Sequence, residues 1–444
     1  MRTPALLLLF TASLLTTRSA RAADFPLKNG DVWVMAGDSI TAQHLHSNYF
    51  EAFCYARYPQ LKFAFRNSGV GGHTIPSTLA RFDYDIEAWK PTVVSVELGM
   101  NDKGGTPTDK FLANMETMVA RIQKASARPV ILAASPVNDG SLTTKLTGGN
   151  QRLHEYANEL KKYCDAQKIP YGDQFHALVD LWGQNKPNEH LSNSLPVLTS
   201  LSQDEKLAGV EHLRSFLAAQ KASTKPLISM QGDPVHPGPP GQLMMAAALL
   251  KELGADPFVS SAVLDAAGKV VEAKGCVIEN AKLNDGVLTF ERLDERLPFP
   301  IPAEAAVVLP LAPAIGEMSQ YTLQVKGLKP TLYSIKVNGV ALPGTFSEKA
   351  LDEGVNLTIA ANTALGNGPV NAIAAQGRAV LGAVSSKEGL VGQWRGLSQK
   401  AHAAGAAPEL KEQLADLTKK VEAADEKIRE AAKPQRLSFE IRAN

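Results

Sequence analysis

Residues 31–41 read Asp31-Val32-Trp33-Val34-Met35-Ala36-Gly37-Asp38-Ser39-Ile40-Thr41, an apolar run that ends abruptly in Gly-Asp-Ser. An uninterrupted apolar run is typical of a strand covered on both faces of a parallel sheet, and helical spacing follows it. Ser39 therefore stands at the carboxyl end of a strand, where α/β proteins place their chemistry. Gly-Asp-Ser is also ordinary turn composition, and a serine there can simply cap a helix.

The first half of the chain alternates between short apolar runs and longer segments with helical spacing. This alternation predicts β-α-β units and a parallel sheet, hence an α/β fold for residues 24–255. Further strands are expected at Lys62–Arg66, Thr92–Leu98, Pro129–Ala134 and Ile169–Val179. Helices are expected at His44–Arg57, Thr78–Glu87, Asp109–Ala125, Gln151–Gln167 and Gln242–Leu253.

Polar stretches follow several of these strands and should converge at one edge of the sheet. Ser39 is the candidate nucleophile, His236 its base, and Asp233 the group that orients the imidazole. The backbone N–H groups of Ser39 and Gly72, with the side-chain amide of Asn101, are candidate donors to an oxyanion. Gly71, next to Gly72, leaves that assignment open by one residue.

These stretches together resemble the SGNH/GDSL family of hydrolases. The matching blocks are Gly37-Asp38-Ser39-Ile40, Asn67-Ser68-Gly69-Val70-Gly71-Gly72, Gly99-Met100-Asn101-Asp102 and Asp233-Pro234-Val235-His236. The resemblance covers about residues 31–253. It implies a flavodoxin-like three-layer α/β/α sandwich and hydrolysis of an ester through an acyl-serine, with no metal and no cofactor. It says little about the remainder of the chain.

Each candidate residue also has a structural interpretation. Asn101 and Asp102 could cap the following helix, and Gly72 or Asp233 could serve only a turn. His236 is the most telling residue, because a proline stands on either side of its loop. Three further histidines lie near these loops in the sequence and are interpreted as surface residues in preference to substrate contacts. They are His44, His46 and His73.

The pattern changes after residue 255. Short alternating runs separated by turn signals predict a small antiparallel β domain at residues 256–362. Residues 363–444 are expected to form a helical hairpin, with a final strand at Leu437–Ile441 that returns to the β domain. The predicted strands of the β domain are Val270–Ala273, Val287–Glu291, Tyr321–Val325, Leu332–Val337 and Asn356–Ala360.

Composition limits the class of protein. The 444 residues include 46 basic and 45 acidic ones, so no nucleic-acid partner is indicated. Residues 1–22 have the charged start, apolar centre and small-residue end of a signal peptide, and no later stretch is apolar for long enough to span a membrane. Three distant cysteines without metal-type spacing are expected to be buried thiols. They are Cys54, Cys164 and Cys276.

These observations predict a secreted or periplasmic serine esterase. The expected substrate is a short acyl ester, most simply acetyl, on a carbohydrate, as a small-molecule or polysaccharide ester. The alternatives are a catalytically silent carbohydrate-binding or scaffolding protein, and a lipase or peptidoglycan O-acetylesterase. The sequence leaves the oligomeric state open.

Overall fold

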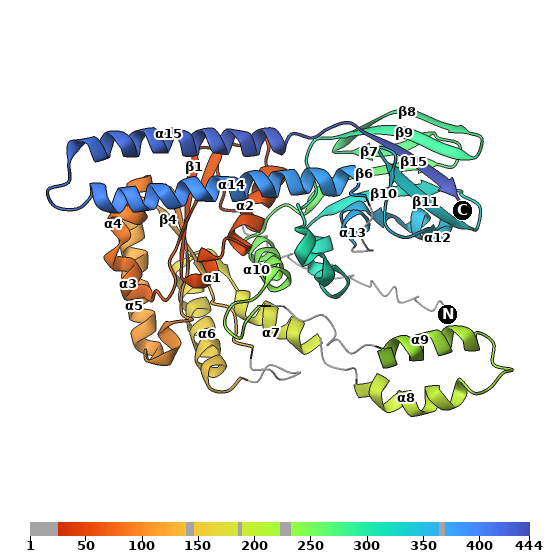
Figure 1. The fold of residues 1–444 in the computed structure, drawn as a ribbon, viewed down its shortest axis with the longest axis horizontal. Helices are drawn as coiled ribbons and strands as arrows, with labels where there is room; N and C mark the ends of the chain where they lie inside the picture. The colour runs from red at the N-terminus through yellow and green to blue at the C-terminus, as the bar shows by residue number, and fades with distance from the viewer. Residues whose placement is uncertain (1–24, 139–145, 185–188, 223–231, 364–368) are drawn as a thin grey trace, which may run out of the picture.

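The protein combines a parallel α/β part, a part built from two further sheets, and a long helical pair (Figure 1). The computed structural model describes residues 25–138, 146–184, 189–222, 232–363 and 369–444. The signal peptide predicted at residues 1–22 lies outside these ranges. None of the helices within them is both long and apolar enough to cross a membrane.

A five-stranded parallel sheet in the order β2-β1-β3-β4-β5 forms the first part, which confirms the predicted α/β fold. Gly37 at the end of β1 pairs with Gly69 of β2 on one side and with Glu97 of β3 on the other. The carboxyl ends of these three strands therefore finish side by side, and the loops that follow them are neighbours. The strands are β1 (Asp31–Gly37), β2 (Phe63–Gly69), β3 (Val93–Glu97), β4 (Arg128–Leu132) and β5 (Tyr171–Gly172).

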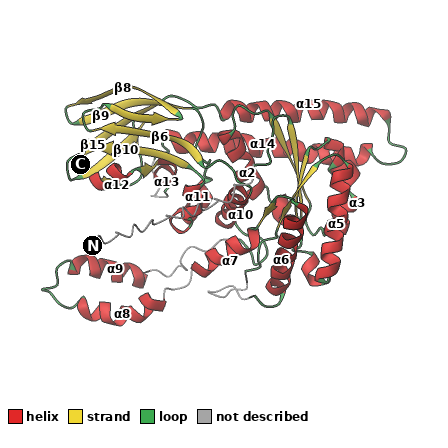
Figure 2. Ribbon diagram, turned by 180° about the vertical axis from the view of Figure 1, so that it is seen from behind, coloured by secondary structure: helices red, strands yellow, loops and turns green. Residues whose placement is uncertain are grey.

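Helices cover both faces of this sheet. Figure 2 shows the strands nearly edge-on, with α2 and α10 on one side and α3 and α5 on the other. The amphipathic pattern predicted for α5 is confirmed, because its apolar side is buried. The helices are α1 (Ser39–Ala42), α2 (His46–Arg57), α3 (Ile75–Ala80), α4 (Phe82–Asp85), α5 (Thr108–Lys124), α6 (Gly149–Gln167), α7 (Gln174–Gln184), α8 (Glu189–Leu201), α9 (Val210–Ala222) and α10 (Pro239–Glu252), with single 3₁₀ turns at Glu87–Trp89 and Asp102–Gly104.

One predicted strand of this part is wrong. Residues 169–179 were expected to be a strand, but β5 is only Tyr171–Gly172 and helix α7 follows it. The apolar side chains of Phe175 and Leu178, three residues apart, are both fully buried. That spacing places them on one face of a helix, so tertiary packing selects the helix.

Two sheets enclose a second core in the next part. One sheet has the order β14-β10-β6-β7, and the other the order β12-β11-β15-β9-β8, with β13 also paired to β11. The β domain was predicted to be antiparallel; it is largely so, but β6 and β10 run parallel. The strands are β6 (Phe258–Asp265), β7 (Val270–Lys274), β8 (Cys276–Asn284), β9 (Val287–Asp294), β10 (Gln320–Lys326), β11 (Leu332–Val337), β12 (Val340–Ala341), β13 (Phe346–Ser347), β14 (Val355–Asn356) and β15 (Leu437–Ala443).

The strand predicted at Asn356–Ala360 is a helix, α13 (Leu357–Asn362). The side chain of Asn356 accepts hydrogen bonds from the backbone N–H groups of Thr358 and Ile359, which caps and starts the helix. Only Val355 and Asn356 remain extended, as β14. This part of the chain also contains a 3₁₀ segment at Ala303–Leu311 and two short helices, α11 (Pro313–Glu317) and α12 (Glu348–Glu353).

The predicted helical hairpin is present as α14 (Ala372–Ala401) and α15 (Pro408–Ala431). It lies along the α/β part (Figure 1), and most of its buried apolar residues belong to the same core as the parallel sheet, whereas Ile373 packs in the second core. Trp394 of α14 stacks on Trp89, with the ring centroids 3.4 Å apart. After the hairpin, β15 enters the second sheet between β9 and β11. The boundaries proposed at residues 255 and 362 stay predictions.

Candidate active site

The structure brings Ser39, His236 and Asp233 into one line of hydrogen bonds. The Ser39 hydroxyl oxygen lies 2.7 Å from Nε2 of His236. Nδ1 of the same ring lies 2.8 Å from Oδ2 of Asp233. Ser39 opens α1 two residues after the end of β1, whereas the other two residues belong to the loop before α10. A hydroxyl, an imidazole and a carboxylate in this order are the groups that activate a serine.

A helix cap and a glycine shape the turn at the end of β1. Asp38 caps α1, since its Oδ1 accepts the N–H of Ile40 at 2.9 Å, so the capping role considered for Ser39 falls to its neighbour. Gly37 is required because a Cβ there would lie 2.0 Å from Oγ1 of Thr41. The Ser39 side chain remains free to face the histidine.

The loop that carries the acid and the base is closed on itself. Gly232 and Pro237 form an isolated bridge, and Gly232 has a φ of +87°; a Cβ there would lie 2.1 Å from the carbonyl oxygen of His236. Oδ1 of Asp233 accepts the backbone N–H groups of Val235 at 2.7 Å and His236 at 2.8 Å. The loop therefore presents Oδ2 of Asp233 to the imidazole.

Hydrogen bonding keeps Asp233 ionised. The backbone N–H of His236, then the His236 ring and the N–H of Val235, lower the pKa of this carboxyl to about 2. A carboxylate has no proton to donate, so Nδ1 of His236 must be the donor in their contact. In the neutral ring Nε2 is then the acceptor and faces the Ser39 hydroxyl, as a general base requires.

The segment of residues 69–73 after β2, called the glycine turn below, lies against the candidate nucleophile. The N–H of His73 donates to the carbonyl of Val70 at 3.2 Å, which closes the turn. Gly72 has a φ of +78°, a conformation that favours glycine, so its predicted turn role is real. A Cβ on Gly71 would lie 3.8 Å from the Cβ of Ser39. Both glycines border the site, and the choice of Gly72 as the oxyanion donor stays a prediction.

Asn101 lies beside the same turn. Its side-chain amide donates to the carbonyl of His73 at 3.1 Å, which leaves the second hydrogen of that amide available. Asn101 makes no capping hydrogen bond, and Pro107 occupies the position before α5. The capping role considered for Asn101 is therefore wrong, while Asp102 is buried and its Oδ1 contacts the N–H of Ile75 at 3.4 Å.

A buried polar cluster lies beneath α1. Glu97 accepts the hydroxyl of Thr41 at 2.6 Å, and burial followed by the charge of Asp38 raises its pKa well above the usual range. Oδ2 of Asp38 has no partner among the described residues, and burial raises the pKa of that residue to about 6. Burial therefore makes both carboxyl groups harder to ionise than they are in water.

The three histidines interpreted as surface residues are structural. His46 is 3% exposed, and both its backbone N–H and its Nδ1 lie 3.0 Å from Oε1 of Gln242, which joins α2 to α10. Nδ1 of His73 accepts from Arg81 at 3.2 Å. His44 has a φ of +57° and lies 3.1 Å from Glu388 of α14. The surface interpretation is wrong for His46, which is buried, whereas His44 and His73 are partly exposed.

His46 is expected to make stability depend on pH. Burial lowers the pKa of His46 to about 4 from an ordinary value of 6.5. Between these pH values the unfolded chain binds a proton on His46 that the folded chain does not bind. Protonation therefore favours the unfolded state, and the free energy of unfolding falls as the pH decreases from 6.5 to 4. The loss is roughly 3 kcal/mol.

Denaturant titrations at pH 7, 5.5 and 4.5 test this expectation. The comparison is between the wild type and His46→Gln, because the acidic groups titrate in both and cancel in the difference. The advantage of the wild type should shrink toward low pH. A difference that stays constant over this range would show that His46 does not titrate as described.

A hollow of about 280 Å³ opens beside the first two helices. His44 and Leu45 on its wall come shortly after α1 in the sequence, and no candidate catalytic residue lines the hollow. Its walls come from α2, the 3₁₀ segment and α14, with polar and apolar groups mixed. The lining residues are His44, Leu45, Asn48, Tyr49, Pro302, Ala303, Glu304, Arg378, Leu381 and Ser385.

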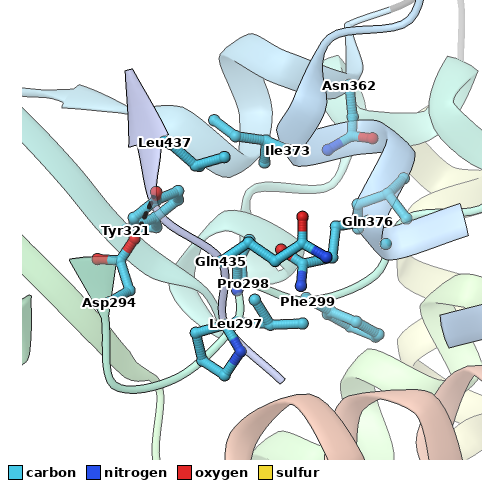
Figure 3. A pocket seen from close by; sticks show the side chains of 13 residues that line it. Asp294, Leu297, Pro298, Phe299, Tyr321, Asn362, Ile373, Gln376, Gln435 and Leu437 are labelled. Carbon is cyan, nitrogen blue, oxygen red and sulfur yellow. Dashed lines mark hydrogen bonds between the residues drawn. The ribbon is translucent and has the colours of Figure 1, made fainter. Parts of the chain in front are cut away.

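A second cavity lies where the two β-sheets meet the helical pair (Figure 3). On one side Tyr321 donates a hydrogen bond to Asp294 at 2.8 Å, and Gln376 and Gln435 reach in from the helical pair and the segment after it. Its volume of about 20 Å³ has room for a water molecule and no more. No candidate catalytic residue lines it, so it is a packing joint.

Thiols and metal-ligating groups add nothing to the site. Cys54, Cys164 and Cys276 are free and buried, as expected. Within the described ranges, no three His, Cys, Asp or Glu side chains converge to hold a metal ion.

Comparison with known proteins agrees with this geometry. Residues 35–193 match the GDSL-like Lipase/Acylhydrolase family. An acetylxylan esterase from Geobacillus stearothermophilus is 25% identical over 209 residues, which are 46% of this chain and 79% of that protein. The solved structure of a gut microbial diltiazem-metabolizing enzyme is 19% identical, with a TM-score of 0.68 over 95% of this chain and 99% of that one.

The fold and the family match define an ester hydrolase. Residues 35–193, within the α/β part, are similar to the GDSL-like lipase/acylhydrolase or SGNH family. The similarity to the diltiazem-metabolizing enzyme shows that the whole architecture, including the two sheets and the helical pair, recurs in another protein.

Proposed function

We propose that Ser39 is the nucleophile of this esterase and that His236 and Asp233 activate it. The observation that carries the proposal is the unbroken line of hydrogen bonds from the Ser39 hydroxyl to the Asp233 carboxylate. His236 takes the hydroxyl proton as Ser39 attacks the ester carbonyl. The alcohol then leaves with that proton. Water, deprotonated by the same imidazole, attacks the acyl-serine, and the acid and the free serine are released.

The oxyanion of each tetrahedral intermediate is held by the N–H groups of Ser39 and Gly72 and by the amide of Asn101. Support comes from the register of the sheet, which brings the ends of β1, β2 and β3 together. One such donor typically stabilises the transition state by roughly 3–4 kcal/mol.

The substrate proposed is a short acyl ester, most simply acetyl, carried by a carbohydrate. The similarity to an acetylxylan esterase supports this class. We place the enzyme outside the cytoplasm, as secreted or periplasmic, on the signal-peptide pattern of residues 1–22.

Two other functions compete with this one. A silent carbohydrate-binding protein would have no need to keep the acid, base and hydroxyl in hydrogen-bond contact. A peptidoglycan O-acetylesterase uses the same chemistry on a different alcohol, and O-acetylated murein assayed beside acetylated xylo-oligosaccharide distinguishes them.

Acyl length should affect the rate strongly. We expect kcat/KM for p-nitrophenyl acetate to exceed that for p-nitrophenyl octanoate by at least about tenfold, because a site shaped for acetyl has no room for the longer chain. Initial rates of p-nitrophenol release by the mature protein measure this ratio. Faster turnover of the octanoate would favour a lipase instead.

A further inference from the structure

The helical pair lies outside the family match at residues 35–193, yet its α14 reaches the glycine turn. Nη1 of Arg395 donates to the carbonyl oxygen of Gly69, the last residue of β2, at 2.9 Å. Its other two nitrogens donate hydrogen bonds to the carboxylate of Asp85, from Nε to Oδ1 at 2.6 Å and from Nη2 to Oδ2 at 2.8 Å. Such a two-pronged contact holds a guanidinium in one orientation.

The peptide between Gly69 and Val70 is thereby held at both ends. Its oxygen accepts from Arg395, and its N–H, on Val70, donates to the carbonyl of Gly37 at 3.1 Å. Gly37 stands two residues before Ser39. A cation on the oxygen polarises the peptide and strengthens the hydrogen bond from its N–H. One peptide group thus links α14 to the strand that carries the candidate nucleophile.

Asp85 extends this support to the rest of the turn. It accepts the hydroxyl of Ser68 at 2.9 Å and pairs with Arg81, which in turn reaches the ring of His73 at 3.2 Å. Burial alone would raise the pKa of Asp85, but the hydrogen bond and charge of Arg395, with the charge of Arg81, lower it. Ser68, just before the turn, and His73, at its end, therefore rest on one ionised cluster.

The hairpin itself is anchored firmly enough to act as a support. Arg66 of β2 forms a double hydrogen bond to Asp425 of α15, at 3.0 and 2.7 Å, with both side chains buried. Lys387 of α14 is fully buried and pairs with Glu51 of α2. Truncating one partner of a buried pair is costly, so these contacts fix the position of α14.

We propose that Arg395 is a positioning residue of the active site: it sets the glycine turn that supplies the oxyanion donor. This inference rests on the proposed function. The C-terminal helical pair is then part of the catalytic unit, although the candidate catalytic residues all come from the α/β part. A displacement of about 1 Å in such a site can cost about 100-fold in rate.

Arg429 of α15 offers a matched control. It also donates from the hairpin to a backbone carbonyl of β2, that of Phe63, at 3.0 Å. Phe63 opens the strand and Gly69 ends it, so the two contacts lie about 20 Å apart. Replacing either arginine removes one guanidinium and one contact to β2, but only one of them adjoins the turn.

The experiment compares Arg395→Ala, Arg395→Lys and Arg429→Ala with the wild type on p-nitrophenyl acetate. Arg395→Ala should lower kcat by about 10- to 100-fold with little change in KM, Arg395→Lys should lower it less, and added guanidinium should partly restore Arg395→Ala. Arg429→Ala should keep its kcat. An equal loss in both alanine variants, or a loss that only follows melting temperature, would overturn the proposal.

Hydrogen exchange measured by mass spectrometry provides a readout that needs no substrate. The peptide containing residues 69–73 should exchange faster in Arg395→Ala than in Arg429→Ala. Unchanged exchange in this peptide, or faster exchange with full kcat, contradicts the positioning role. If the wild type itself hydrolyses no ester through Ser39, the proposed function fails, and the exchange comparison alone decides whether Arg395 holds the turn.

Discussion

Ser39→Ala is expected to lower kcat/KM on p-nitrophenyl acetate by at least about 10⁴-fold. Without the hydroxyl no acyl-serine forms, and only binding and the oxyanion donors continue to accelerate the attack of water. Removing Oγ deletes a single hydrogen bond, to His236, so stability should change little. The rate, corrected for spontaneous hydrolysis, and the melting temperature together test this expectation.

Ser386→Ala is the control for this substitution. Ser386 lies exposed on α14, and its hydroxyl donates to the carbonyl of Gly382 within the same helix. Its rate should equal that of the wild type. A fluorophosphonate probe should label the wild type and Ser386→Ala but not Ser39→Ala. Turnover by Ser39→Ala equal to the wild-type rate would refute the mechanism.

Asp233→Asn is expected to lower kcat by about 10³- to 10⁴-fold. Oδ1 of Asp233 already accepts two backbone N–H groups, so an asparagine must place its own oxygen there. Its NH₂ group then faces Nδ1 of His236 as a donor. The ring must carry its proton on Nε2 instead, and that nitrogen can no longer accept the proton of Ser39.

Asp265→Asn provides the comparison for this substitution. Oδ1 of Asp265 accepts the N–H groups of Ala267 at 3.0 Å and Lys269 at 2.8 Å in a similar turn. It therefore tests the cost of an asparagine in such a turn without a catalytic imidazole. Full activity in Asp233→Asn would show that the carboxylate does not select the tautomer of the ring.

The sequence predicts which candidate residues lie near one another because parallel strands bring their carboxyl ends together. Ser39, the glycine turn and Asn101 are separated by about thirty residues each along the chain, yet they follow three strands that pair in the sheet. The position of Asp233 three residues before His236 was enough to predict their contact. Short sequence spacing and the order of strands in the sheet are therefore enough to predict these neighbours.

Long-range side-chain contacts could not be predicted in the same way. Arg395 lies more than 300 residues from Asp85, and no motif marks it among the other arginines. His46 was taken for a surface residue because its partner, Gln242, lies on a helix 196 residues later. Such contacts depend on how separate elements pack, and periodicity says nothing about them.

The position of β15 has a consequence for how the molecule is made. Leu437–Ala443 is an inner strand of its sheet, with β9 on one side and β11 on the other. During synthesis those two strands leave the ribosome long before the segment that must lie between them. Each then exposes an unpaired edge, which is open to pairing with other chains. Aggregation during expression should therefore fall when a chaperone covers these edges until β15 arrives.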